Sequence, residues 1–180
     1  MQALGIDPER LQVITIQLVR LMNGKEIVRM SKRTGEMVSL GELIEDIGVD
    51  AARFFFNLRQ ADSHFDFDLE LALTQTNENP VYYVQYAHAR ICSILRLLRE
   101  EDHVTLPAYA DIDMTLLQEE AEKDLIEKLA YFPEEIVTAA QTTDPTRLTH
   151  YAMDLAALFH SFYNACRVRC EDQKLMYARL

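Results

Sequence analysis

A long amphipathic segment that begins at Asn79-Pro80 is the feature that most limits how this chain can fold. Proline is tolerated in the first turn of a helix, so this pair marks a helix start. Apolar residues then recur with helical spacing at Ala87, Ile91, Ile94, Leu95 and Leu98. Because a helix with one apolar stripe must bury it against another element, the segment predicts a bundle of helices.

The rest of the C-terminal part also has helical patterns. Residues 103–110, which contain Pro107, are expected to be a loop. Helices are expected near residues 114–131 and 134–142, and a last long one from Asp144-Pro145 past Tyr163. The apolar pattern reaches Leu180 without a capping Gly or Asn. We therefore expect a mainly α chain whose bundle is truncated at its C-terminus.

The first third of the chain has a different pattern. Residues 11–21 are nearly continuous apolar sequence with Val and Ile, which is typical of a strand buried on both faces. Asn23-Gly24 follows and is a strong hairpin signal, because both central residues need positive φ. Residues 26–30 are then expected to form a short return strand, and the polar residues 31–36 a loop.

Ser39 and Glu42 form a capping-box pattern that predicts a helix ending at Gly48. A second short helix is expected from Asp50 to about Arg59, and residues 61–68 are expected to be a connector. The chain thus has three expected parts: residues 1–38, a helical connector at 39–76, and a helical bundle at 77–180.

Charge is unevenly distributed along the chain. It carries 18 Lys and Arg against 29 Asp and Glu, which gives a formal net charge of −11. Such acidity argues, at face value, against a protein that holds nucleic acid by bulk charge. Residues 100–144, however, contain 13 acids and 2 bases, and the remainder has 16 of each. We expect this acidic segment to face solvent or away from a nucleic acid, so the charge does not exclude an RNA partner.

Three cysteines, Cys92, Cys166 and Cys170, do not form a disulfide framework, which favours a reducing cytoplasm. Cys166 and Cys170 are four apart and fit one helix face, but a metal site needs more ligands. We therefore expect buried thiols and no metal. No apolar run approaches the 18 or more residues of a membrane span, so no membrane partner is expected.

The loop from Arg29 to Gly35 carries the groups best suited to chemistry. It combines cations, hydroxyls and a glycine directly after the hairpin. Lysine and arginine neutralise phosphate oxygens whose charge grows during displacement, and hydroxyls add hydrogen bonds. The composition fits a polyphosphate site, and it also fits a solvated basic loop.

The order of the residues resembles a known family. Met30-Ser31-Lys32 resembles the core of the Lys-Met-Ser-Lys-Ser signature of class I aminoacyl-tRNA synthetases. Residues 50–55, 61–68 and 77–90 resemble arginyl-tRNA synthetase, and the last, Asn-Glu-Asn-Pro-Val-Tyr-Tyr-Val-Gln-Tyr-Ala-His-Ala-Arg, is the most specific. Asp-Leu-Ala-Ala at 154–157 loosely matches the Asp-Ala-Leu-Arg region of that family's anticodon domain. The resemblance covers essentially the whole chain.

The resemblance implies a ligase that activates arginine with ATP and Mg²⁺ and transfers it to tRNA(Arg). Lys32 matches the second lysine of the signature, so it is the expected catalytic residue and contacts the α- and β-phosphates. Arg29 replaces the first lysine and Arg33 the final serine, while Thr34 supplies a hydroxyl. The expected ATP-binding residues are Arg29, Met30, Ser31, Lys32, Arg33 and Thr34.

Part of the family's active site is missing from the sequence. Class I enzymes also need a His-x-Gly-His element on a Rossmann fold, and none of the five histidines here has a neighbouring glycine. Residues 1–38 are therefore expected to be the end of a Rossmann-type catalytic domain. ATP and arginine are expected to bind through an absent N-terminal half, so the chain is expected to be inactive alone.

The resemblance also implies that residues 77–180 bind the tRNA anticodon arm, with no DNA partner. Tyr82, Tyr86 and Arg90 share a helix face, and bases stack on such groups. Packing in the core is the competing interpretation; we expect Tyr83 to point to the core and Tyr86 with Arg90 to be exposed. For the C-terminal arginines, the alternative is a solvated face. The expected tRNA contacts are Asn79, Tyr82, Tyr83, Gln85, Tyr86, Arg90, Arg167 and Arg169.

Two other functions remain open at this stage. Another class I synthetase with the same type of anticodon domain, such as the cysteinyl enzyme, is one alternative. The motif at 77–90 argues against it. The other is a helical protein-interaction module with a vestigial loop, which would have no affinity for tRNA.

Overall fold

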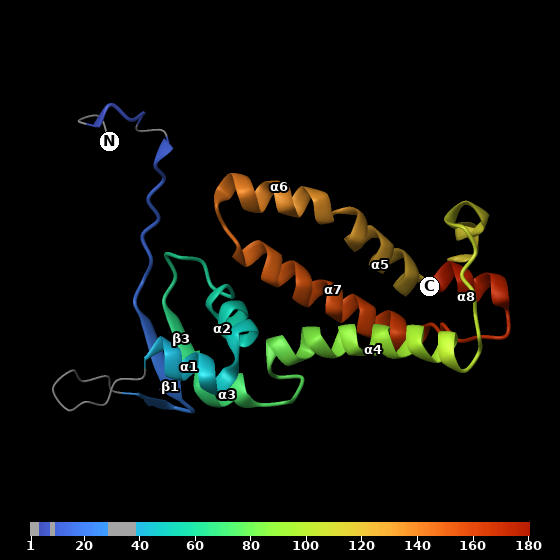
Figure 1. Cartoon of the computed structure of the whole chain (residues 1–180), viewed down its shortest axis with the longest axis horizontal. Helices are drawn as coiled ribbons and strands as arrows, with labels where there is room; N and C mark the ends of the chain where they lie inside the picture. The colour runs from blue at the N-terminus through green and yellow to red at the C-terminus, as the bar shows by residue number, and fades with distance from the viewer. Residues whose placement is uncertain (1–3, 8–9, 29–38) are drawn as a thin grey trace. The chain divides into compact units, whose positions relative to one another are not determined.

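The computed structural model describes residues 4–7, 10–28 and 39–180. It divides into two units, Met1–Glu70 and Leu71–Leu180, each of which is treated by itself. The first unit holds a small sheet and short helices, and the second is helical (Figure 1). This confirms the expected fold class, a helical bundle preceded by a β-hairpin. The division at residues 1–38, 39–76 and 77–180 stays a prediction.

The predicted hairpin is present in the first unit. Strands β1 (Val19–Asn23) and β2 (Glu26–Ile27) are antiparallel, with Asn23 opposite Glu26. Gly24 lies at the turn with φ of +59°, a conformation that glycine adopts without strain. The asparagine–glycine pair therefore acts as its sequence predicts.

Residues 61–68 were expected to be a connector, and this was wrong for Phe65–Asp68, which form strand β3. β3 pairs in parallel with β1, so the sheet order is β2-β1-β3. The Phe-Asp-Phe-Asp alternation has the period of a strand with one buried face. Phe67 is fully buried, whereas Asp66 faces out and accepts two hydrogen bonds from Arg20, at 2.6 and 2.9 Å.

The expectation of a doubly buried strand over residues 11–21 was also wrong. The strand begins only at Val19, and Val13 and Leu18 are 75% and 82% exposed. Within the described ranges, residues 11–18 form no strand. A strand is buried on both faces only when other elements cover both faces. An apolar run alone does not supply those elements.

Two short helices complete the first unit, and a third spans the boundary with the second. Helix α1 (Leu40–Ile47) has the predicted capping box, in which Ser39 Oγ accepts from the Glu42 N–H at 3.1 Å. Gly48 ends α1 at φ of +84°, and α2 (Val49–Phe56) starts at once and stops before the predicted Arg59. α3 spans Leu69–Leu73. Phenylalanine rings at positions 55, 56, 65 and 67 contact one another, and Phe55 and Phe67 are buried in the core of this unit.

The second unit is built on the two longest helices. α4 (Pro80–Glu100) and α7 (Thr146–Ala165) lie side by side, and α5 (Glu120–Ala130) and α6 (Phe132–Thr142) run along α7 (Figure 1). α8 (Gln173–Arg179) closes the chain. The core cluster comprises Ala87, Leu98, Ala156, Phe159, Phe162, Cys166, Val168 and Met176.

Two helix predictions need correction. The helix expected over residues 114–131 begins as a 3₁₀ turn, Met114–Leu116, which is capped by the Asp113 carboxylate accepting from the Thr115 N–H at 3.0 Å. The α-helix starts later, at Glu120. On α4, Ile91 and Leu95 of the predicted apolar stripe are 39% and 42% exposed, so the bundle covers only part of the stripe.

No described helix has the length and apolar character needed to cross a membrane. Within the same residues, no group of three or more His, Cys, Asp or Glu side chains is arranged to hold a metal ion. The three cysteines are free thiols, with Cys166 in the core and Cys92 exposed on α4.

Candidate nucleic-acid interface

Asn79 fixes the start of α4 and hence the orientation of the motif that follows it. Its side-chain oxygen accepts from the Val81 N–H at 3.0 Å, and its amide nitrogen donates to the Thr74 carbonyl at 2.8 Å and the Ala72 carbonyl at 3.2 Å. Asn79 is only 4% exposed. This residue, expected to contact tRNA, is therefore used as a buried helix cap.

Tyr82, Tyr86 and Arg90 form the aromatic and cationic face that their spacing predicts. The Tyr82 and Tyr86 rings are stacked, with centroids 6.0 Å apart and planes 8° from parallel. Arg90 Nη2 donates to the Tyr86 hydroxyl at 3.1 Å, and its guanidinium carbon lies 4.4 Å from the centre of that ring. Tyr86 and Arg90, which were expected to be exposed, are half-buried, as is Tyr82.

Helix α7 adds Tyr163 to this face. The guanidinium carbon of Arg90 lies 4.6 Å from the centre of the Tyr163 ring, which is 40% exposed. One cation thus contacts rings from two helices, an arrangement favoured by the negative charge on ring faces. We call the group Tyr82, Tyr86, Arg90 and Tyr163 the tyrosine–arginine ladder.

His160 of α7 lies behind the ladder and is a residue that the sequence analysis missed. Its Nδ1 is 3.1 Å from Arg90 Nη1, and its ring packs edge-on against Tyr83 at 4.8 Å. Burial lowers the pKa of His160; the nearby Tyr83 backbone raises it and the charge of Arg90 lowers it. His160 lies three residues before Tyr163 on α7, so the two side chains share a helix face. That spacing is the sequence signal that could have identified His160.

The two remaining predicted residues of the α4 motif lie on different sides of the helix. Tyr83 packs against the core cluster, as expected, and touches His160. Gln85 is exposed. Only Gln85 of this pair has a side chain open to a partner.

The two C-terminal arginines behave differently. Arg167 is exposed and lines, with Tyr163 and Asn164, a hollow of about 650 Å³ beside the ladder. Arg169 instead forms ion pairs with Asp102 and, at 3.4 Å, with Glu101. Its charge is therefore partly neutralised inside the chain, whereas Arg167 extends the basic character of the ladder.

The acidic segment 100–144 was expected to face solvent or away from a nucleic acid, and most but not all of its acids are exposed. Glu122 is buried at 2% exposure, and Glu135 is half-buried and accepts from Arg147 at 2.8 Å. The segment forms α5 and α6, which pack on α7. Part of the excess charge is therefore paired with basic residues of the bundle.

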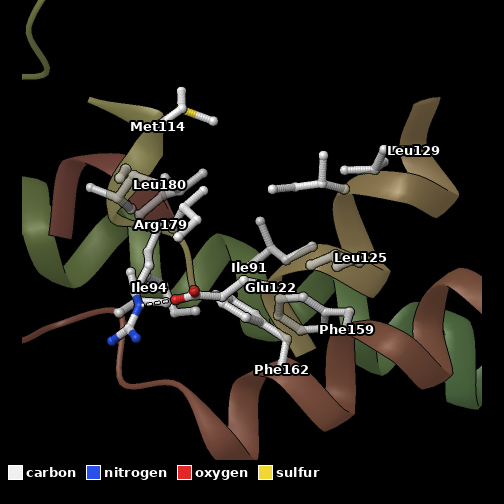
Figure 2. A pocket seen from close by; sticks show the side chains of 15 residues that line it. Ile91, Ile94, Met114, Glu122, Leu125, Leu129, Phe159, Phe162, Arg179 and Leu180 are labelled. Atoms are coloured by element: carbon white, nitrogen blue, oxygen red, sulfur yellow. Dashed lines mark hydrogen bonds and ion pairs between the residues drawn. The ribbon is translucent and has the colours of Figure 1, made fainter. Parts of the chain in front are cut away.

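A second hollow, of about 300 Å³, lies between α4, α5 and α7, and its lining is largely apolar (Figure 2). Ile91, Leu125 and Phe159 contribute to that lining. At one end the Glu122 carboxylate accepts from Arg179 Nε at 2.6 Å, as the dashed line in Figure 2 marks. The paucity of polar groups makes this hollow a poor RNA site, and the ladder is the better candidate.

The residues expected to hold ATP, Arg29 to Thr34, lie outside the described residues. Their roles, including that of Lys32, stay predictions. The structural argument for a site therefore concerns the second unit alone.

Arginine–tRNA ligases are similar to this chain over nearly its whole length. The chain resembles the arginine–tRNA ligase of Caldanaerobacter subterraneus subsp. tengcongensis, at 62% identity over 99% of this chain and 32% of that protein. It resembles the arginine–tRNA ligase of Desulforudis audaxviator at 60% identity, over 99% of this chain and 32% of that protein. The chain thus spans about a third of the length of these relatives. The expected resemblance to arginyl-tRNA synthetase is confirmed.

Two solved structures of arginyl-tRNA synthetases are also similar to this chain. An arginyl-tRNA synthetase structure from Campylobacter jejuni matches with a TM-score of 0.82 and 26% identity, over 99% of this chain and 38% of that one. The Thermus thermophilus arginyl-tRNA synthetase matches with a TM-score of 0.58 and 26% identity, over 82% of this chain and 25% of that one. The family model described as the DALR anticodon binding domain matches residues 84–180, which include Tyr86, Arg90, His160 and Tyr163. The chain therefore belongs to the DALR anticodon-binding domain family.

Proposed function

We propose that the chain binds the anticodon arm of tRNA(Arg) through the tyrosine–arginine ladder on α4 and α7. The observation that carries the proposal is the contact of one arginine with rings from both helices, at 4.4 and 4.6 Å. Bases released from an RNA loop stack on tyrosine rings and on guanidinium planes. Gln85 and Arg167 extend this surface with an amide and a second cation.

The charge distribution supports this placement. Arg90 and Arg167 have no acidic partner in the described part of the chain, whereas Arg169, Arg179 and Arg147 are each paired with an acid. An arginine without an acidic partner can neutralise an RNA phosphate and release the counterion of that phosphate. Binding is therefore expected to weaken as salt rises, despite the net charge of −11.

Tyr86→Ala is expected to weaken binding of tRNA(Arg) to the 180-residue chain by about tenfold, since stacking of one base on an aromatic ring contributes about 1–3 kcal/mol. The ring also supports Arg90, so its loss removes two contacts at once. A filter-binding titration at fixed salt measures the change. Tyr109→Ala, at a ring that is 78% exposed on another segment, is the matched control and should bind like the wild type. Equal affinities of all three proteins would refute the assignment.

We further propose that the chain is part of a cytoplasmic arginine–tRNA ligase, in which residues 29–34 hold the phosphates of ATP. The 62% identity to a protein of that name supports arginine over the cysteinyl alternative. The three cations and two hydroxyls of the loop have the chemistry that a polyphosphate with Mg²⁺ needs. Because the sequence contains no His-x-Gly-His element, we propose that arginine and ATP need residues beyond these 180, and that the chain alone forms no arginyl-adenylate.

A further inference from the structure

We propose that His160 is a positioning residue for RNA binding: its neutral ring accepts a hydrogen bond from Arg90 and holds the guanidinium against Tyr86 and Tyr163. This inference rests on the proposed binding of RNA by the ladder. It assigns a role to a residue that, in the proposed complex, lies behind the RNA-facing groups.

The first step is the protonation state of the ring. An arginine guanidinium has only N–H donors, so the 3.1 Å contact between Arg90 Nη1 and His160 Nδ1 requires a lone pair on Nδ1. The single ring proton is therefore on Nε2. A second proton on Nδ1 would turn two donors and two positive charges toward one another.

The second step is the surroundings of the ring. His160 Nε2 is buried and has no hydrogen-bonding partner within the residues that the structure describes. The ring faces Tyr83 and Tyr86, with centroid distances of 4.8 and 5.8 Å. Besides the neighbouring Tyr83 backbone, which raises its pKa, the ring's polar contact in the described part of the bundle is the one to Arg90, so we assign to it the orientation of that side chain.

The third step is what this contact does for Arg90. The arginine side chain is long and flexible, and each of its rotatable bonds must be fixed before the guanidinium can meet an RNA group in one orientation. Two of its five donors are engaged, by the Tyr86 hydroxyl and by His160, both at 3.1 Å. The guanidinium plane is thereby set against both rings before RNA arrives, which lowers the entropy lost on binding.

Three substitutions separate this role from simple packing. Asparagine places its amide oxygen close to where Nδ1 lies, so His160→Asn should keep tRNA affinity within about threefold of the wild type. His160→Leu removes the acceptor and should weaken binding about tenfold, the usual loss for a hydrogen bond to a charged group. His88→Leu, the same change at an exposed histidine on α4, should have no effect.

The experiment measures tRNA(Arg) binding by the 180-residue chain, with thermal unfolding of each variant as a check on the fold. If His160→Leu does not fold, His160→Gln replaces it, because glutamine carries its terminal amide nearer to the position of Nε2 than of Nδ1. Recovery with Asn but not with Leu or Gln supports the proposal. Equal losses with Asn and Leu, or no loss with Leu, overturn it.

A double-mutant cycle with Arg90→Ala completes the test. If His160 acts through Arg90, His160→Leu should cost nothing further once Arg90 is alanine. An undiminished additional loss in the double variant would overturn the positioning role. The proposed function fails separately, when Arg90→Ala itself leaves tRNA affinity unchanged.

Discussion

Glu122→Ala is expected to destabilise the helical unit by about 3–5 kcal/mol, the usual cost of removing one partner from a buried ion pair. The side chains of Glu122 and Arg179 are 1% and 11% exposed, and their closest atoms are 2.6 Å apart. The substitution would leave the guanidinium of Arg179 without its carboxylate beside an apolar hollow (Figure 2). It would also remove a cap, because Glu122 Oε2 accepts from the Glu119 N–H at the start of α5 at 2.9 Å.

Urea unfolding followed by circular dichroism measures this difference in free energy. Asp154→Ala is the matched control, since Asp154 pairs with Lys128 at 2.8 Å but is 64% exposed. Its loss should be about 0–1 kcal/mol, as for other surface ion pairs. Glu122→Gln, which keeps the shape and one carbonyl acceptor, should fall between the two. Similar losses in the buried and exposed pairs would contradict the account of Glu122 as a buried charge.

Lys32→Ala in a full-length ligase that contains this chain is expected to slow arginine activation by about 10²–10³-fold, the usual effect of removing one group that stabilises transition-state charge. The lysine would neutralise the α- and β-phosphates while pyrophosphate leaves. Affinity for tRNA(Arg) should stay within about twofold, because the loop is not part of the ladder. ATP–pyrophosphate exchange and filter binding measure the two quantities on the same protein.

Two controls accompany the measurement on Lys32→Ala. Lys25→Ala removes an exposed lysine from the turn of the hairpin and should leave exchange unchanged. The wild-type 180-residue chain should show no exchange. Equal losses of exchange and tRNA affinity in Lys32→Ala would argue against a role confined to the phosphates, and exchange by the isolated chain would refute the need for further residues.

Elements with a strong local signal could be predicted from the sequence. Ser39 and Glu42 satisfy each other's backbone N–H groups, Asn23-Gly24 makes a turn, and Asn79-Pro80 starts a helix. Each signal depends on residues within a few positions of one another. The helix starts and the hairpin therefore needed no knowledge of the tertiary structure.

Features that depend on distant partners could not be predicted in this way. The apolar residues 11–18 resemble a buried strand, but burial depends on neighbours that the described residues do not provide. β3 was missed because a four-residue strand is defined by its pairing with β1. Arg169 was expected to face tRNA, but the fold brings Asp102, 67 positions away, into contact with it.

The candidate site shows the same division between local and distant signals. The spacing of Tyr82, Tyr86 and Arg90 along one helix was enough to predict a shared face. His160 and Tyr163 lie on a helix about 70 residues further along, and only the packing of α7 on α4 shows that they contact Arg90. The motif on α4 identified three of the four ladder residues, and the tertiary structure added the fourth, Tyr163, and the supporting His160.

The most direct test of RNA binding by this chain is a titration of the wild-type protein with tRNA(Arg) and with a non-cognate tRNA, at about 50 and 200 mM salt. We predict tighter binding of tRNA(Arg) at both concentrations, with affinity for both RNAs falling as salt rises. Absence of binding to either RNA at the lower salt, or equal affinity for the two at both salts, would contradict the account of α4 and α7 as an anticodon-binding surface.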